Sequence, residues 1–102
     1  MVRHAFSMKI KHGAEAEYTK RHDEVWPEMG KVLKEAGASN YSIFRKGLVL
    51  FAYVELENME KWNALPKNPV VQKWWDYMAD IMDVNPDNSP VSESMEQVFF
   101  LD

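Results

Sequence analysis

The sequence predicts an α+β fold in which helices cover one face of a four-stranded antiparallel sheet. Segments with the periodicity of strands and of helices follow one another in the order strand, helix, strand, strand, helix, strand. Two of the strands are separated only by the turn Lys46-Gly47, so they are expected to pair as an antiparallel hairpin. This order is that of the split βαβ, or ferredoxin-like, arrangement.

Length and composition favour one small domain over residues 1–102. With no cysteine, disulfides and thiolate metal sites are impossible. The formal net charge is −4, and no basic stripe is present to attract nucleic acid. No segment has the length and apolar character of a signal peptide or a membrane span. We therefore expect a cytoplasmic protein that binds neither nucleic acid nor a membrane.

The first half of the chain predicts a strand and a long helix. We expect the strand over 5–10, where apolar and polar residues alternate, and the helix over 14–35, ended by Gly37. Pro27 lacks the N–H that would bond the Asp23 carbonyl, so a kink or break is expected there. At helical spacing one apolar stripe is formed by Ala14, Tyr18, Val25, Met29, Val32, Leu33 and Ala36.

The second half predicts three strands and two helices, with a turn-rich loop over 84–90. Asn58 is suited to cap the first of these helices, and Asn68 with Pro69 to start the second. The predicted elements are strands over 40–45 and 48–55, helices over 59–65 and 69–82, and a closing strand over 95–101.

Two of the predicted strands are apolar on both faces. Every residue of 48–54 is apolar, and so is every residue of 98–101. Helices cover only one side of the sheet, and a large apolar face is rarely left in water. We therefore predict a homodimer built face to face through the sheets, with a monomer whose tail folds over that face as the alternative.

His22 is a candidate catalytic residue because it falls inside the apolar stripe of the long helix. Imidazole titrates near neutral pH and is suited to give or take a proton. The alternative is an imidazole that only bonds a backbone carbonyl. His4 and His12 have no spacing to His22 that would make a helical metal pair, so no metal is predicted.

Aromatic residues near His22 favour a ligand pocket. Tyr18 lies one helical turn before His22 and Trp26 follows it, while Tyr41 begins the next strand. Such rings also fill cores, so a packing role is the alternative for each. Aromatic residues make up 13% of the chain, four of them Trp, which is more than a core of this size needs.

The pair Trp74-Trp75 is the other informative motif. Adjacent helix positions point about 100° apart, so Trp74 is predicted in the core and Trp75 on a pocket wall. Indole faces suit the C–H surface of a sugar, and hydroxyl and imidazole groups suit its oxygens. The sequence lacks a phosphate loop, a serine nucleophile elbow and a spaced carboxylate pair. A polyol therefore fits this pocket better than a phosphate or an acid.

Taken together, the motifs resemble those of the L-rhamnose mutarotase family nearly end to end. They are Tyr18-x-x-Arg21-His22-x-x-x-Trp26-Pro27-Glu28, Asn40-Tyr41, Trp62-Asn63-Ala64, Trp74-Trp75-x-Tyr77-Met78 and Asn85-Pro86-Asp87-Asn88-Ser89-Pro90-Val91. One departure is the turn Arg45-Lys46-Gly47, which is shorter than usual for the family.

The resemblance implies a dimeric α+β barrel that interconverts the α and β anomers of L-rhamnose without a metal or other cofactor. It implies His22 as the proton donor and substrate contacts from Tyr18, Tyr41, Trp74 and Trp75. The base that takes the anomeric proton and the range of sugars stay unassigned. Two alternatives are a small-ligand monooxygenase of the dimeric α+β barrel type and a non-catalytic sugar-binding dimer.

Overall fold

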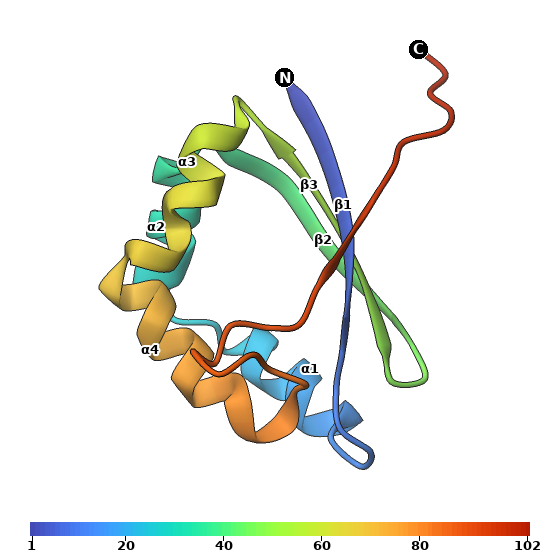
Figure 1. The fold of residues 1–102 in the computed structure, drawn as a ribbon. Coiled ribbons are helices and arrows are strands. Elements are labelled where there is room, and N and C mark those ends of the chain that lie inside the picture. The colour runs from blue at the N-terminus through green and yellow to red at the C-terminus, as the bar shows by residue number, and fades with distance from the viewer.

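A computed structural model describes all 102 residues and contains one antiparallel sheet with the strand order β2-β3-β1-β4. All helices lie on one side of this sheet (Figure 1). The predicted ferredoxin-like fold is therefore confirmed. The strands are β1 (Val2–Lys9), β2 (Ala38–Lys46), β3 (Val49–Leu56) and β4 (Glu93–Met95).

The predicted helix over 14–35 is two helices, α1 (Glu15–Asp23) and α2 (Pro27–Glu35). Trp26 is extended, with φ −62° and ψ 136°, and Pro27 begins α2. The residue before a proline avoids the helical region, so that of the expected kink or break the structure has the break. Val25 was predicted on the buried stripe, and this was wrong: it lies in the break and is 41% exposed.

The later helices begin where the sequence predicted and end earlier. Asn58 caps α3 (Met59–Ala64) and Asn68 caps α4 (Pro69–Met78), each through its side-chain oxygen. Short 3-10 turns, η1 (Leu65–Lys67) and η2 (Ala79–Ile81), follow α3 and α4. Each 3-10 turn continues the α-helix before it, so helical structure reaches Lys67 after α3 and Ile81 after α4.

The hairpin of β2 and β3 is confirmed, with Lys46 paired to Val49 across the turn. A bulge interrupts the pairing between Ser39 and Ser42, and Asn40 there has a φ of 49°. Asparagine tolerates this left-handed conformation better than most residues. The extra residue re-aims the strand locally, so that Tyr41 faces the helices.

The predicted final strand over 95–101 was wrong in its bounds. β4 covers only Glu93–Met95, and residues 96–102 have no regular structure. Val98 is 89% exposed, and the tail crosses beyond the sheet edge (Figure 1). An apolar segment forms a strand only where a neighbouring strand is available to pair with it, and the tail pairs with none beyond Met95. Phe100 instead packs on the Arg3 guanidinium at 3.8 Å.

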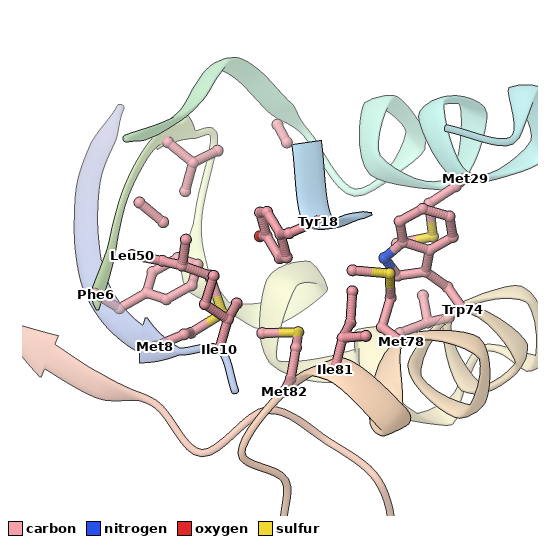
Figure 2. Packing of buried hydrophobic residues seen from close by; sticks show 14 of the residues in the cluster. Phe6, Met8, Ile10, Tyr18, Met29, Leu50, Trp74, Met78, Ile81 and Met82 are labelled. Carbon is pink, nitrogen blue, oxygen red and sulfur yellow. The ribbon is translucent and has the colours of Figure 1, made fainter. Parts of the chain in front are cut away.

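The core lies between the sheet and the helices. Phe6, Met8 and Leu50 from the sheet face Trp74 and Met78 of α4, and Tyr18 of α1 projects into the space between them (Figure 2). Alternate residues of β3, from Leu50 to Leu56, are buried on this side. The side of the sheet that faces the helices therefore forms one wall of the core.

The opposite face of the sheet is only partly covered, because the tail lies beside Arg3, Ala5 and Tyr53 while the hairpin end of the face stays open. Phe44 and Phe51, paired across β2 and β3, are 67% and 42% exposed. The tail reaches this face only near Arg3, whose guanidinium lies 3.8 Å from the centre of the Phe100 ring, and it leaves both phenylalanines exposed. It therefore gives only part of the cover that the monomeric alternative predicts.

The helices are all too short or too polar to span a lipid bilayer.

Candidate active site

A cavity of about 780 Å³ lies between the helical layer and the inner face of the sheet. This volume is within the range of small-molecule pockets. The five residues predicted to form a site all line it, namely Tyr18, His22, Tyr41, Trp74 and Trp75. The fold brings them together from α1, β2 and α4.

The His22 ring is held on three sides. Its Nδ1 lies 3.2 Å from the backbone oxygen of Tyr18. It stacks on the Tyr18 ring at 4.2 Å and meets the Trp74 ring edge-on at 5.4 Å. Because a carbonyl oxygen only accepts hydrogen bonds, Nδ1 carries the proton and Nε2 is left free for a ligand.

Burial sets the protonation of the site. It lowers the pKa of His22, against smaller opposing effects of the Tyr18 carbonyl and Asp23. Burial, and then the neighbouring Tyr41 phenol, raises the pKa of Tyr18, and burial raises the pKa of Tyr41. Both phenols are therefore neutral hydrogen-bonding groups near pH 7, and His22 is the group that can exchange a proton there.

The two tryptophans divide as the helix geometry predicts. Trp74 is 7% exposed and packs edge-on against Trp26 at 5.0 Å. Trp75 is only half-buried and forms part of the cavity wall. Trp74 thus supports His22 from behind, and Trp75 offers an indole surface to a ligand.

A second aromatic group lines the cavity, and we call it the sheet cluster; the sequence predicted a site role for its member Tyr41 and not for the others. Its members contact one another at ring distances of 5.1 to 6.4 Å. Strand alternation places two of them on the inner face, and that signal could have found them. The sheet cluster consists of His4, Phe6, Tyr41 and Trp62.

Two polar features were also missed. Arg21, whose motif position was noted without a role, bonds Glu17, Tyr77 and Asp80. Asn85 and Ser89, of the predicted loop, line the cavity and bond each other at 3.0 Å. No three His, Asp or Glu side chains lie close enough together to hold a metal ion.

A ferredoxin-like domain with an aromatic cavity, neutral hydroxyls and one oriented histidine belongs to the class of proteins that bind a small, mostly uncharged ligand. The chain belongs to the L-rhamnose mutarotase family, whose sequence profile matches residues 3–101.

Individual relatives agree with this assignment. The L-rhamnose mutarotase of Lachnoclostridium phytofermentans is 52% identical over 104 residues, covering 100% of both chains. The crystal structure of L-rhamnose mutarotase from Formosa agariphila covers 100% of both chains with a TM-score of 0.93 and 46% identity. A putative antibiotic biosynthesis monooxygenase from Nitrosomonas europaea has a TM-score of 0.64 over 97% of this chain and 100% of its own. At 12% identity it shares the fold alone.

Proposed function

We propose that this chain is an isomerase that interconverts the α and β anomers of L-rhamnopyranose by general acid/base ring opening and reclosure. The family membership and the relatives of about 50% identity support this reaction. We further propose His22 as the proton donor and Tyr18, Tyr41, Trp74 and Trp75 as substrate contacts.

The reaction needs one proton delivered and one removed. Because burial lowers the pKa of His22, the protonated ring is the minor form near pH 7, and it is this form that reacts. The His22 imidazolium gives the Nε2 proton to the ring oxygen as the bond from that oxygen to the anomeric carbon breaks. The anomeric hydroxyl gives its proton to a general base, which stays unassigned, and becomes the aldehyde. After rotation about the adjacent C–C bond, the freed hydroxyl attacks the other face of the carbonyl and returns its proton to Nε2, while the base returns its proton to the carbonyl oxygen, which becomes the new anomeric hydroxyl. His22 therefore ends each cycle in the state in which it began.

The observation that supports the assignment is the free Nε2 of a His22 ring that lines the cavity. The Nδ1 bond alone also fits the structural alternative, an imidazole that only bonds a backbone carbonyl. Here Nδ1 is bonded to Tyr18 and the ring also lines the cavity. The neutral phenols of Tyr18 and Tyr41 can then bond sugar hydroxyls, and the Trp75 indole can pack on the deoxy, methyl-bearing side.

Saturation-transfer NMR of L-rhamnose tests this function. The purified protein should accelerate exchange between the two anomer signals, with parallel assays on L-fucose and D-glucose defining the sugar range. Binding of L-rhamnose without faster exchange would contradict the isomerase and indicate a sugar-binding dimer. A haem Soret band would instead support the monooxygenase alternative, for which the fold is the sole common feature.

We also propose a homodimer that joins the sheet faces opposite the helices in two protomers. The paired and exposed Phe44 and Phe51 support it, because apolar surface of this kind is seldom left in water. Phe51→Glu should give a monomer by light scattering at micromolar concentration. Lys31→Glu, an exposed change on α2, is the control and should stay dimeric. A wild-type protein that is monomeric would overturn this proposal.

The cellular setting is part of the proposal. An anomer-interconverting isomerase supplies whichever anomer the next enzyme of rhamnose metabolism accepts. We place this step in the cytoplasm, as the sequence predicts, and cell fractionation with a specific antibody would check the location.

A further inference from the structure

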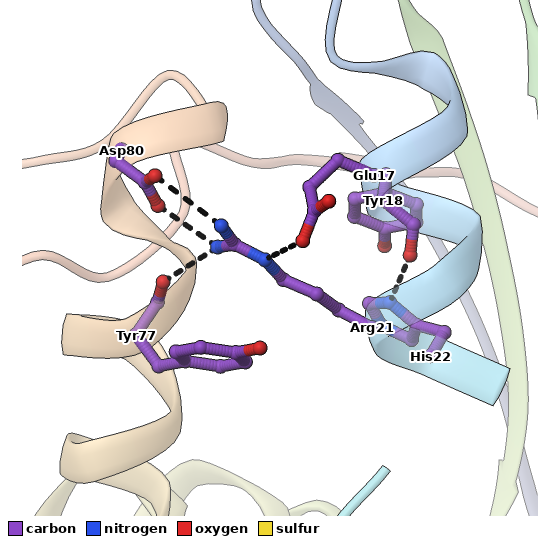
Figure 3. A network of polar contacts seen from close by, with 6 residues as sticks. All are labelled: Glu17, Tyr18, Arg21, His22, Tyr77 and Asp80. Atoms are coloured by element: carbon purple, nitrogen blue, oxygen red, sulfur yellow. Dashed lines mark hydrogen bonds and ion pairs between the residues drawn. The ribbon is translucent and has the colours of Figure 1, made fainter. Parts of the chain in front are cut away.

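Arg21 joins two helices outside the cavity (Figure 3). Its Nη1 donates to the Tyr77 carbonyl at 2.7 Å and to Asp80 at 2.8 Å, and Nη2 reaches the second Asp80 oxygen at 3.3 Å. Its Nε bonds Glu17 at 2.8 Å, one turn back on α1. The guanidinium therefore donates to three groups at once, the Glu17 and Asp80 carboxylates and the Tyr77 carbonyl. A lysine cannot reproduce this geometry.

The arginine end of this contact is enclosed, whereas both carboxylates are more open, Glu17 at 43% and Asp80 at 66% exposed. The Arg21 side chain is 12% exposed, and its guanidinium carbon lies 4.5 Å from the centre of the Tyr77 ring. Exposed ion pairs contribute little because both side chains must be ordered in water. Here Glu17 and the Tyr77 ring hold the guanidinium in place, so the pairing with Asp80 requires less ordering.

The contact matters because little else fixes α1. The backbone of α1 approaches other helices and strands only sparsely. Tyr18 packs in the core and the His22 ring meets Trp74 at 5.4 Å, but only Arg21 links a side chain of α1 to another element by hydrogen bonds. The break before Pro27 also removes the stiffness that one continuous helix with α2 would supply.

The far end of the contact is the C-terminal end of the helix that carries both cavity tryptophans. Tyr77 is the penultimate residue of α4, where backbone carbonyls lack helical partners and carry partial negative charge. Tyr77 itself packs on Trp26 at 5.5 Å and on Trp74 at 5.7 Å. Arg21 thus ties the segment that bears His22 to the segment against which the His22 ring rests.

We propose that Arg21 is a positioning residue that fixes α1 against the end of α4 and thereby sets where His22 stands in the cavity. This inference rests on the proposed function of His22. Arg21 points away from the cavity and is absent from its lining, so it acts through its neighbour and not on the substrate. Misplacing an acid/base group by about 1 Å can cost on the order of 10²-fold in rate.

Two variants and a control test the proposal by kcat and KM for L-rhamnose exchange, at a temperature at which circular dichroism shows each protein folded. Arg21→Met keeps the stem and removes the donors, and we expect kcat to fall by about 10- to 100-fold while KM changes little. Arg21→Lys should fall in between. Lys20→Met removes an exposed charge from the same helix and should behave as wild type.

A ligand-free measurement separates positioning from the proposed reaction. In wild type, the His22 and Trp74 rings should give a nuclear Overhauser effect, because their centres lie 5.4 Å apart. Arg21→Met should weaken or abolish it. A wild type without exchange activity would contradict the proposed function, whereas this measurement would still decide the position of His22.

The proposal is overturned if folded Arg21→Met keeps both the wild-type kcat and the His22–Trp74 effect. If Arg21→Met does not fold, Asp80→Ala takes its place, because it removes both acceptor oxygens of a side chain that is 66% exposed, and this loss should be tolerated. A reduced kcat in Asp80→Ala supports the proposal, and an unchanged kcat contradicts it.

Discussion

The two halves of the cavity each contain a histidine among aromatic rings. In the helical half, His22 stacks on Tyr18 at 4.2 Å, and in the sheet cluster, His4 stacks on Phe6 at 5.1 Å. Both ring planes are tilted by 27° from those of their partners, and each histidine also meets a tryptophan edge-on. Burial lowers the pKa of both.

The difference lies in how the two rings are held. His22 bonds a backbone carbonyl through Nδ1, and its helix is tied to α4 by Arg21. The ring nitrogens of His4 make no hydrogen bond to the protein, so nothing fixes which nitrogen carries the proton. A perturbed pKa is therefore common to both histidines, while a defined orientation is particular to His22.

The largest expected effect tests this difference directly. His22→Ala should lower the rate of L-rhamnose anomer exchange by about 10²- to 10⁴-fold, which is the usual contribution of a positioned acid/base group. The matched variant His4→Ala should keep most of the rate. Saturation-transfer NMR measures both, and the near-ultraviolet circular dichroism of each protein checks its packing.

Two outcomes would contradict this distinction between His22 and His4. A folded His22→Ala protein with the wild-type rate would remove His22 from the chemistry. A loss in His4→Ala as large as that in His22→Ala would make the sheet cluster part of the acid/base machinery, and orientation would then be a poor guide to the catalytic residue.

The tryptophans of the two halves should differ in stability. Trp74 is buried at 7% exposure, so Trp74→Ala should lower the free energy of unfolding by about 3–5 kcal/mol. Trp62 is only half-buried, and Trp62→Ala should cost about 1–2 kcal/mol. Urea unfolding followed by circular dichroism measures both. Equal losses would show that the sheet cluster is as tightly packed as the helical half.

The sequence predicted the fold well because its signals are local. Alternation in β1, the Lys46-Gly47 turn and the caps Asn58 and Asn68 each act over a few residues, and each appears in the structure. The final strand was predicted too long because a strand needs a neighbouring strand to pair with, and the tail pairs with none after Met95. Pairing of that kind is a tertiary property, which local alternation cannot report.

The candidate site divides in the same way. Tyr18 and His22 could be placed together from the spacing of one helix, and Trp74 and Trp75 could be separated by their helix geometry. Arg21 could not be given a role from its sequence, because its partner Asp80 lies 59 positions away. Contacts between distant segments depend on packing angles that periodicity does not specify.

The smallest expected effect uses pH to compare the two histidines. An unfolded histidine has a pKa near 6.5, and burial lowers the pKa of both His22 and His4 in the fold. At pH values between the folded and the unfolded pKa, the unfolded chain binds more protons than the folded one. The stability that the two neutral histidines contribute is therefore present above about pH 6.5 and is lost as the pH falls toward the pKa values of the folded state. The lowered pKa of Asp80 keeps its titration below this window.

The melting temperature should therefore fall modestly from about pH 7.5 to about pH 5.5. His22→Gln and His4→Gln should each reduce this fall, and an undiminished fall in the double variant would show that other groups cause it.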